Sequence, residues 1–286
     1  MVWLILSLLT ATFEAGKDLF SKQNLEIFDS YAIAWILTTL TGLLLIPVLL
    51  LLGVPTLGDR FWWALLAGGS LNIIAILLYM KALESSDLSL SVPMITFTPL
   101  FLLFTSPLIV GEIPTVKDGV GVCFIVGGAY VLKLEARRRG YWAPLRALWK
   151  ERGPKFMLGV AFIWSITSNI DKIGIQNSSP IGWAMAIFLF NSLIFLPVML
   201  QYSDGSWRAI PRHWRPLLRL GICGALSISC QTVALTLTSV VHVISIKRLS
   251  VPLGVLFGHF ILGERKIEER LSGAIAMVFG VFLIAS

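Results

Sequence analysis

Ten apolar stretches, most of them about twenty residues long, constrain this chain more than any other feature of its sequence. They cover 2–20, 31–52, 62–80, 89–110, 116–134, 156–175, 181–201, 214–236, 240–262 and 269–285. Runs of this length can cross a bilayer as helices, whereas strands of a membrane barrel would be shorter and would alternate apolar with polar residues. We therefore expect an all-α membrane protein with ten transmembrane helices and no soluble domain.

The composition excludes several other classes of protein. Hydrophobic residues make up 56% of the chain and charged residues only 14%, against roughly 25% charged residues in an average soluble domain. A soluble enzyme, a disordered chain and a nucleic-acid-binding module are therefore not expected. The three histidines are scattered, and we find no motif typical of a hydrolase, a nucleotide site or a metal site. We expect no enzymatic activity, no cofactor and no bound metal.

The two halves of the sequence resemble each other. From the third stretch onward the offset is 152 residues, and it aligns Trp62 with Trp214, Gly111-Glu112 with Gly263-Glu264, and Gly128 with Gly280. Five spans per repeat is an odd number, which predicts two inverted repeats with the substrate site near the midplane between the halves. We assign the repeats to 1–134 and 156–286, joined by a basic surface linker over 135–155.

Ten spans in two halves, each with a Gly-Glu pair after its fourth span, resemble the drug/metabolite transporter superfamily of the EamA type. The resemblance covers essentially the whole chain, and it implies a secondary transporter that works by alternating access. The pair also has a structural explanation. Gly111 and Gly263 can end one helix, and Glu112 and Glu264 then meet the positive dipole end of the next helix. A gating or proton-linked role is the alternative.

The ninth stretch carries two adjacent basic residues, Lys247 and Arg248. Both lie about 10 Å from the preceding loop if the segment is helical, and ionisable residues at such depth usually mark a functional site. His242 and Ser245 precede the pair by about one turn, and Ser250 follows it. Together these residues could bind an anion, since arginine holds phosphate or carboxylate with two hydrogen bonds. The alternative is an ion pair with an acid such as Glu14 or Asp18.

A Lys-Arg pair in the ninth span also resembles the phosphate-translocator branch of the superfamily, in which the pair holds the substrate phosphate. This resemblance implies a small organic anion, including phosphorylated ones, bound by Lys247 and Arg248. Their repeat mates, Ile95 and Thr96, are uncharged, and the fourth span lacks the additional lysine of those translocators. The substrate is therefore not expected to be triose phosphate.

Two acidic residues of the first stretch, Glu14 and Asp18, lie four residues apart and so share one helical face. They could bind a cationic substrate or carry a proton, or Glu14 could pair with Lys17 while Asp18 lies at the membrane interface. The first possibility points to an exporter of amino acids or cationic drugs. A carrier or flippase of lipid phosphates is a further alternative. A third polar cluster, Asn169, Asp171 and Lys172, lies in the sixth stretch with Asp171 near its end. We expect these residues to cap the helix at the membrane interface.

Uncharged polar residues and prolines complete the candidate site. Asn72, Tyr79 and Gln231 could line a substrate pathway or form hydrogen bonds between helices. The prolines interrupt the fourth and ninth stretches, and such repeat-related interruptions are a pointer to a substrate site. They are Pro93, Pro99, Pro107 and Pro252.

The distribution of basic residues predicts the orientation of the chain. Loops after odd-numbered stretches hold 17 lysines and arginines, and loops after even-numbered stretches hold three. The positive-inside rule makes the basic loops cytoplasmic and both termini external, whereas the family resemblance implies cytoplasmic termini. We expect an integral protein of the plasma (inner) membrane. Its expected partners are a small-molecule substrate and the lipid bilayer, with no nucleic acid, and a homodimer is allowed for.

Overall fold

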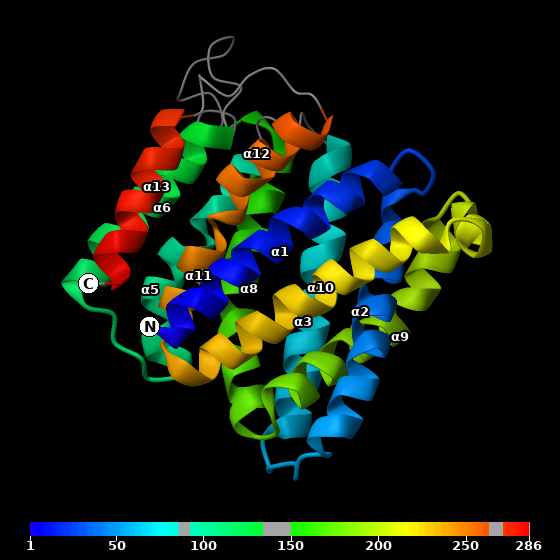
Figure 1. Cartoon of the computed structure of the whole chain (residues 1–286), viewed down its shortest axis with the longest axis horizontal. Coiled ribbons are helices and arrows are strands. Elements are labelled where there is room, and N and C mark those ends of the chain that lie inside the picture. Colours follow the sequence, from blue (N-terminus) through cyan, green and yellow to red (C-terminus); the bar gives the residue numbers. More distant parts are fainter. Residues whose placement is uncertain (86–91, 134–149, 263–270, 286) are drawn as a thin grey trace. The chain divides into compact units, whose positions relative to one another are not determined.

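The computed structural model describes residues 1–85, 92–133, 150–262 and 271–285, and every regular element in these ranges is a helix (Figure 1). The elements are α1 Val2–Asn24, α2 Ser30–Leu52, α3 Phe61–Ser85, η1 Val92–Phe97, α5 Thr98–Ile109, α6 Val116–Lys133, α8 Arg152–Gln176, α9 Pro180–Tyr202, η2 Ser206–Arg212, α10 Trp214–Leu237, α11 Val240–Lys247, α12 Ser250–Leu262 and α13 Leu271–Ala285. Most of the expected linker and the second Gly-Glu pair lie outside the described residues.

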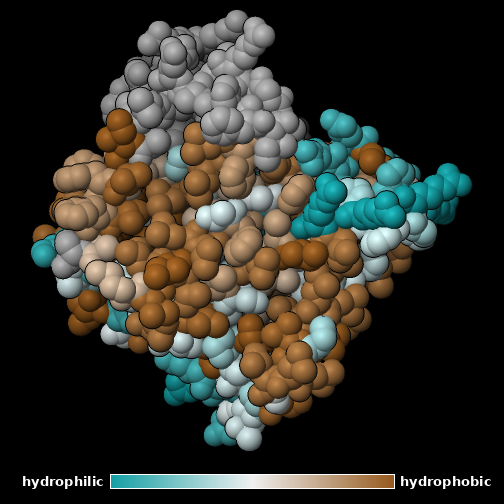
Figure 2. Space-filling model, viewed as in Figure 1, coloured by the Kyte–Doolittle hydropathy of each residue, from teal (hydrophilic) through white to brown (hydrophobic). Residues whose placement is uncertain are grey.

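The surface of these helices fits a lipid environment. Four described helical segments are long and apolar enough to cross a membrane: Ser30–Leu52, Phe61–Tyr79, Pro180–Tyr202 and Trp214–Leu237. Large apolar side chains face outward, with Leu108 at 84% and Leu193 at 72% of full exposure. Figure 2 shows apolar side chains covering much of the face in view. The prediction of an all-helical membrane protein is confirmed, and the number of spans remains a prediction.

Two compact units divide the chain. Unit 1 contains Met1–Ile73 and Asp171–Leu237, and unit 2 contains Ile74–Ile170 and Thr238–Ser286. Each unit therefore combines segments from both halves of the sequence. The helices α3 and α8 each contribute residues to both units.

In unit 1, α2 packs along α9, and α1 packs along α10. The Thr39 and Ser192 hydroxyls of α2 and α9 lie 2.5 Å apart in a hydrogen bond. One turn further along α2, a Cβ added at Gly42 would lie 2.7 Å from the Leu189 side chain. The matching stretches IPVLL around Pro47 and LPVML around Pro197 align α2 with α9 at an offset of 150 residues. At this offset Thr39 is the repeat mate of Leu189, and Gly42 is the repeat mate of Ser192. The two contacts are therefore reciprocal.

In unit 2, α6 packs along α13 through glycines (Figure 1). A Cβ added at Gly280 would lie 2.5 Å from the Gly121 carbonyl oxygen, and a Cβ added at Gly128 would lie 2.5 Å from the Gly273 carbonyl oxygen. Small residues of this kind allow two backbones in a membrane to approach closely. Gly121 and Gly128 are the repeat mates of Gly273 and Gly280, so these contacts are reciprocal as well.

Asp29 ties the start of α2 to the segment that follows α9. Its Oδ1 accepts hydrogen bonds from the backbone N–H groups of Tyr31 and Ala32, and its Oδ2 accepts hydrogen bonds from the hydroxyls of Ser203 and Ser206. Partial burial raises the pKa of Asp29, but these hydrogen bonds outweigh it and hold the pKa at about 2. Asp29 is therefore charged at neutral pH, as suits an acidic cap at a helix N-terminus.

The glycine contacts in unit 2 predict that alanine destabilises the protein at one of two adjacent positions and not at the other. Gly128→Ala should lower the free energy of unfolding by about 1–3 kcal/mol, because the new methyl group meets the backbone of α13. Gly127→Ala is the matched control, since a Cβ there meets nothing within 4 Å. Thermal unfolding of the purified protein in detergent measures both. Equal melting temperatures for the two variants would contradict the packing described here.

The Asp29 cap predicts a loss of stability that is constant around neutral pH. Asp29→Ala should destabilise the protein by about 0.5–2 kcal/mol, the usual range for a lost N-cap. Since the folded-state pKa lies below the ordinary value of 3.8, the ionic part of this contribution is complete above about pH 5 and is lost as the pH falls toward 2. Thermal unfolding at pH 5 to 8 should give the same difference from wild type throughout, and a difference that disappears in this range would refute the assignment.

Candidate functional site

The helix of the ninth stretch is interrupted at the basic pair. α11 ends at Lys247 and α12 begins at Ser250, with Arg248 and Leu249 in a turn between them. The Arg248 N–H donates to the Ser245 carbonyl oxygen at 3.1 Å. Pro252 has no N–H to donate four residues back, and the Arg248 carbonyl oxygen instead accepts from Val251 N–H at 3.0 Å. The proline thus accounts for the break, and the break lies at the two charged residues.

The fourth stretch changes its helix type at the matching place. The 3-10 helix η1 ends at Phe97 and α5 begins at Thr98, with Pro99 as its second residue. The Thr98 hydroxyl donates to the Ile95 carbonyl oxygen at 2.8 Å, which replaces the bond that Pro99 cannot form. At the offset of 152, Phe97 aligns with Leu249. Both expected interruptions are therefore present, and only the second copy carries charge.

Hydroxyl groups flank the basic pair in sequence. Ser245 is fully buried, and its Oγ has no hydrogen-bond partner among the described residues. Ser250 is 9% exposed, and it begins α12. Lys247 and Arg248 are each half-buried. A buried hydroxyl with unused hydrogen-bonding capacity beside two cations could serve a polar or anionic ligand.

His242 belongs to a network that the sequence did not predict. Its Nε2 lies 2.8 Å from Asp118 Oδ1, and its Nδ1 lies 2.8 Å from the Thr238 hydroxyl. Asp118 Oδ2 accepts from the backbone N–H and the hydroxyl of Thr115, at 2.7 and 2.8 Å. The imidazole is thus oriented from both of its nitrogens. Thr115 and Asp118 have the spacing of a capping box, which is the sequence signal that could have identified this acid.

Glu112, in the Gly-Glu pair that follows α5, binds a different helix from the one expected. Its Oε2 accepts from Val240 N–H at 2.8 Å, at the start of α11 and 128 residues away. Glu112 thus meets the positive end of α11, a helix that the sequence did not point to. Gly111 has a φ of +74°, a conformation that glycine adopts without strain. Glu112 therefore fastens the segment between α5 and α6 to α11, and Asp118 fastens the first turn of α6 to the same helix.

The acidic residues of the first stretch lie in unit 1. Glu14 Oε1 forms an ion pair with Lys17 Nζ at 2.6 Å, and its Oε2 accepts from the Ser227 hydroxyl at 3.0 Å. The Asp18 side chain is 64% exposed and lies 3.7 Å from Lys17 Nζ. This is the ion pair that the sequence left open as one of two alternatives. The Lys17 charge therefore compensates that of Glu14.

The remaining polar candidates are distributed over both units. In unit 1, Gln231 is 4% exposed on α10, one turn after Ser227, and Asn72 is half-buried on α3. In unit 2, the Tyr79 ring stacks on Trp164 with 6.4 Å between the ring centroids. Of the ten predicted site residues, unit 1 holds four, and unit 2 holds Tyr79, His242, Ser245, Lys247, Arg248 and Ser250.

The cluster around Asn169 and Asp171 connects helices. Asn169 is fully buried, its Oδ1 accepts from the Ser106 hydroxyl at 2.8 Å, and its Nδ2 donates to the Thr105 hydroxyl at 3.1 Å. Asp171 accepts from the Trp183 indole N–H at 2.9 Å. Asn169 therefore joins α8 to α5, and the interface capping expected of this cluster stays a prediction. Within the described ranges, no three His, Cys, Asp or Glu side chains gather as metal ligands would.

Comparison with known proteins identifies one family. The model of the EamA-like transporter family matches residues 1–134 and 152–286. No curated protein matches the chain, whereas 28 chains of solved structures do. One crystal structure has a TM-score of 0.80 and 16% sequence identity over 97% of this chain and 94% of the other. Identity this low shows a shared fold alone.

The contact between Glu112 and α11 predicts a graded loss of stability. Glu112→Ala should lower the free energy of unfolding by about 1–3 kcal/mol, because the N–H of the fully buried Val240 loses its acceptor. Glu112→Gln retains an acceptor oxygen and should lose less. Lys117→Ala, at an exposed position in the first turn of α6, serves as the control. Thermal unfolding in detergent ranks the variants, and an alanine variant as stable as wild type would show that the contact contributes nothing.

Proposed function

The chain belongs to the EamA-like transporter family, and on that premise we propose that it is a secondary transporter of a small organic anion that works by alternating access. Phosphorylated metabolites are included in this class. The protein is an integral membrane protein of a transporter family. The observation that carries the anion proposal is the position of Lys247 and Arg248 at the break between α11 and α12.

Charge and backbone geometry support this assignment. Interrupted helices in transporters place half-helix N-termini, with their partial positive charge, toward anionic groups of the substrate. Here α12 begins at Ser250, two residues after Arg248. In the proposal Arg248 holds the anion through its guanidinium fork, Lys247 adds a point charge, and the buried Ser245 hydroxyl donates a hydrogen bond. Ser250, His242 and Tyr79, which belong to the same unit, contribute to the polar surroundings.

The proposed architecture is ten spans in two inverted repeats, 1–134 and 156–286, with a linker over 135–155. The contacts within each unit support this architecture. When a two-fold axis relates two halves, a contact between residue i and the repeat mate of residue j is matched by a contact between residue j and the repeat mate of residue i. The glycines of α6 and α13 satisfy this relation, and so do the contacts of α2 with α9. We further propose a location in the plasma (inner) membrane with the basic loops cytoplasmic.

An exporter of amino acids or cationic drugs is the alternative, with Glu14 and Asp18 as the binding residues. The ion pair between Glu14 and Lys17 at 2.6 Å argues against it, because a cationic substrate would have to displace the lysine. A lipid-phosphate carrier would use Lys247 and Arg248, and it differs from our proposal in its substrate.

Transport measurements test the anion proposal. A thermal-shift screen with inorganic phosphate, glucose 6-phosphate, AMP, citrate and lysine selects a ligand, and exchange of that ligand is measured in proteoliposomes. Lys247→Gln and Arg248→Gln should each lower exchange of an anion by about 10- to 100-fold, since each removes a charged hydrogen bond.

Lys155→Gln removes an exposed charge on α8 and should leave exchange unchanged. Full exchange in both variants of the basic pair would refute the anion site. Stabilisation and exchange by lysine alone, abolished in Glu14→Gln, would establish the cation exporter instead.

A further inference from the structure

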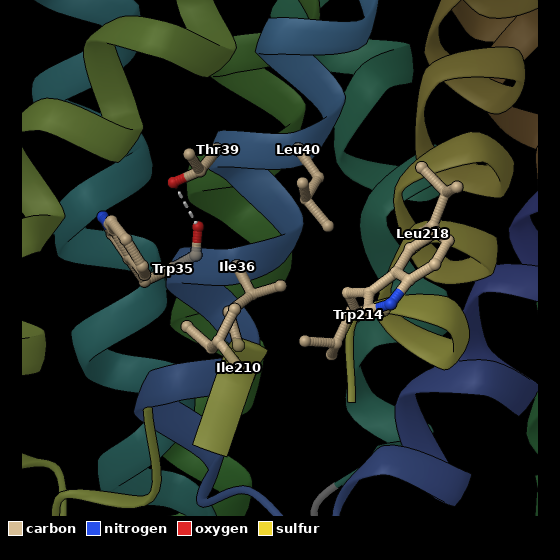
Figure 3. Close-up of a pocket in the computed structure, with 8 residues that line it drawn as sticks. Trp35, Ile36, Thr39, Leu40, Ile210, Trp214 and Leu218 are labelled. Atoms are coloured by element: carbon tan, nitrogen blue, oxygen red, sulfur yellow. Dashed lines mark hydrogen bonds between the residues drawn. The ribbon is translucent and has the colours of Figure 1, made fainter. Parts of the chain in front are cut away.

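Unit 1 contains an apolar cavity of about 250 Å³ where α2, η2 and the first turns of α10 meet (Figure 3). The lining residues are Trp35, Ile36, Thr39, Leu40, Ile210, Trp214, Leu217 and Leu218. Leu217 is fully buried, and Trp214 is 54% exposed. The cavity is therefore a surface groove, which we call the α2–α10 groove. Cavities of about 150 Å³ with aliphatic walls already bind benzene, so this groove has room for a segment of hydrocarbon chain.

The walls of the α2–α10 groove favour an apolar occupant. The hydroxyl of Thr39 already donates to the Trp35 carbonyl oxygen at 2.7 Å (Figure 3). It is also hydrogen-bonded to the Ser192 hydroxyl. Its hydrogen-bonding capacity is therefore used within the protein. A polar ligand would lose its hydration without compensation at the other walls, whereas a hydrocarbon chain would lose nothing.

The segment that forms one side of the groove is rich in arginine. The segment 203–219 holds Arg208, Arg212, Arg215 and Arg219, all exposed, against a single acid, Asp204. The Arg215 guanidinium lies 5.5 Å from the centroid of the Trp214 ring, which itself lines the groove. Figure 2 shows hydrophilic side chains gathered around η2, next to the apolar surface. The segment that supplies Ile210, Trp214, Leu217 and Leu218 to the groove thus also carries these four exposed arginines, which we call the arginine rim.

We propose that the α2–α10 groove binds one acyl chain of an anionic phospholipid, whose phosphate contacts the arginine rim. The lipid is a bound structural ligand and not the transported substrate, and its residues are distinct from Lys247 and Arg248. A phospholipid of this kind combines the two properties that the groove requires, an apolar chain and a negative headgroup. A second copy of the chain fits less well, because a two-fold dimer through this groove would bring two arginine rims together.

Lipid retention by the purified full-length protein tests the headgroup contact. Native mass spectrometry from detergent with added dioleoyl phosphatidylglycerol or dioleoyl phosphatidylcholine should show preferential retention of phosphatidylglycerol. The variant Arg212→Gln/Arg215→Gln/Arg219→Gln should lose this preference by about fivefold per arginine at low ionic strength, with phosphatidylcholine retention unchanged. Arg152→Gln, at an exposed position of α8, should retain it.

A second set of variants tests the groove itself. Leu218→Trp fills the groove from α10 and should reduce retention of both lipids, and Ile210→Phe fills it from η2 if the first variant does not fold. Leu226→Trp places the same side chain at a 41% exposed position of α10 outside the groove and should retain lipid as wild type does.

Two outcomes would overturn the proposal. Equal retention of the two lipids by the wild-type protein would refute the proposed contact between the lipid phosphate and the arginines. Unchanged lipid retention in both groove-filling variants would refute the acyl-chain site. If the oligomeric state of these variants then differed from that of wild type, the groove would be an interface between copies of the chain. The proposed transport function is tested separately, because Lys247→Gln and Arg248→Gln should keep the bound phosphatidylglycerol.

Discussion

A peptide group in hydrocarbon must form its hydrogen bonds within the protein. This requirement determines most of the backbone structure of the chain. It accounts for long helices over the apolar stretches, and it makes every departure from helix costly. The two departures in the fourth and ninth stretches are both compensated locally. The Thr98 hydroxyl binds the carbonyl oxygen that Pro99 leaves free, and Val251 N–H binds the one that Pro252 leaves free. A break maintained at such a cost, at the two basic residues, is a reason to look there for function.

The same requirement shapes the contacts of the helix ends. The N–H groups in the first turn of a helix have no partner within that helix. In α11 the Glu112 carboxylate satisfies one of them from a segment far away in the sequence. In α2 the Asp29 carboxylate satisfies two, and it also accepts hydrogen bonds from two serines that follow α9. Both carboxylates thus cap a helix and at the same time join segments from different halves of the chain.

The sequence predicted the helices well, because span length and hydropathy follow directly from the thickness of the bilayer. It was less accurate at their ends, as the first stretch was expected to end at residue 20 and α1 continues to Asn24. It also located the interrupted helix and the basic pair, since prolines and buried charges are visible in one dimension. It could not identify the partner of Glu112 or the Asp118 that binds His242, because those pairings depend on which helices pack together. For the same reason it did not foresee that each compact unit would combine segments from both halves of the sequence.

The reciprocal glycine contacts between α6 and α13 have an evolutionary consequence. If the two halves arose by duplication, the ancestral half would have met an identical copy, and any substitution at Gly121 would have affected two contacts at once. In the fused chain Gly121 and Gly273 are encoded separately, so each half can change alone. The residues at 95–96 and 247–248 show that freedom, with Ile-Thr in one half and Lys-Arg in the other. Fusion thus permits a charge that a symmetrical pair of halves would have had to carry twice.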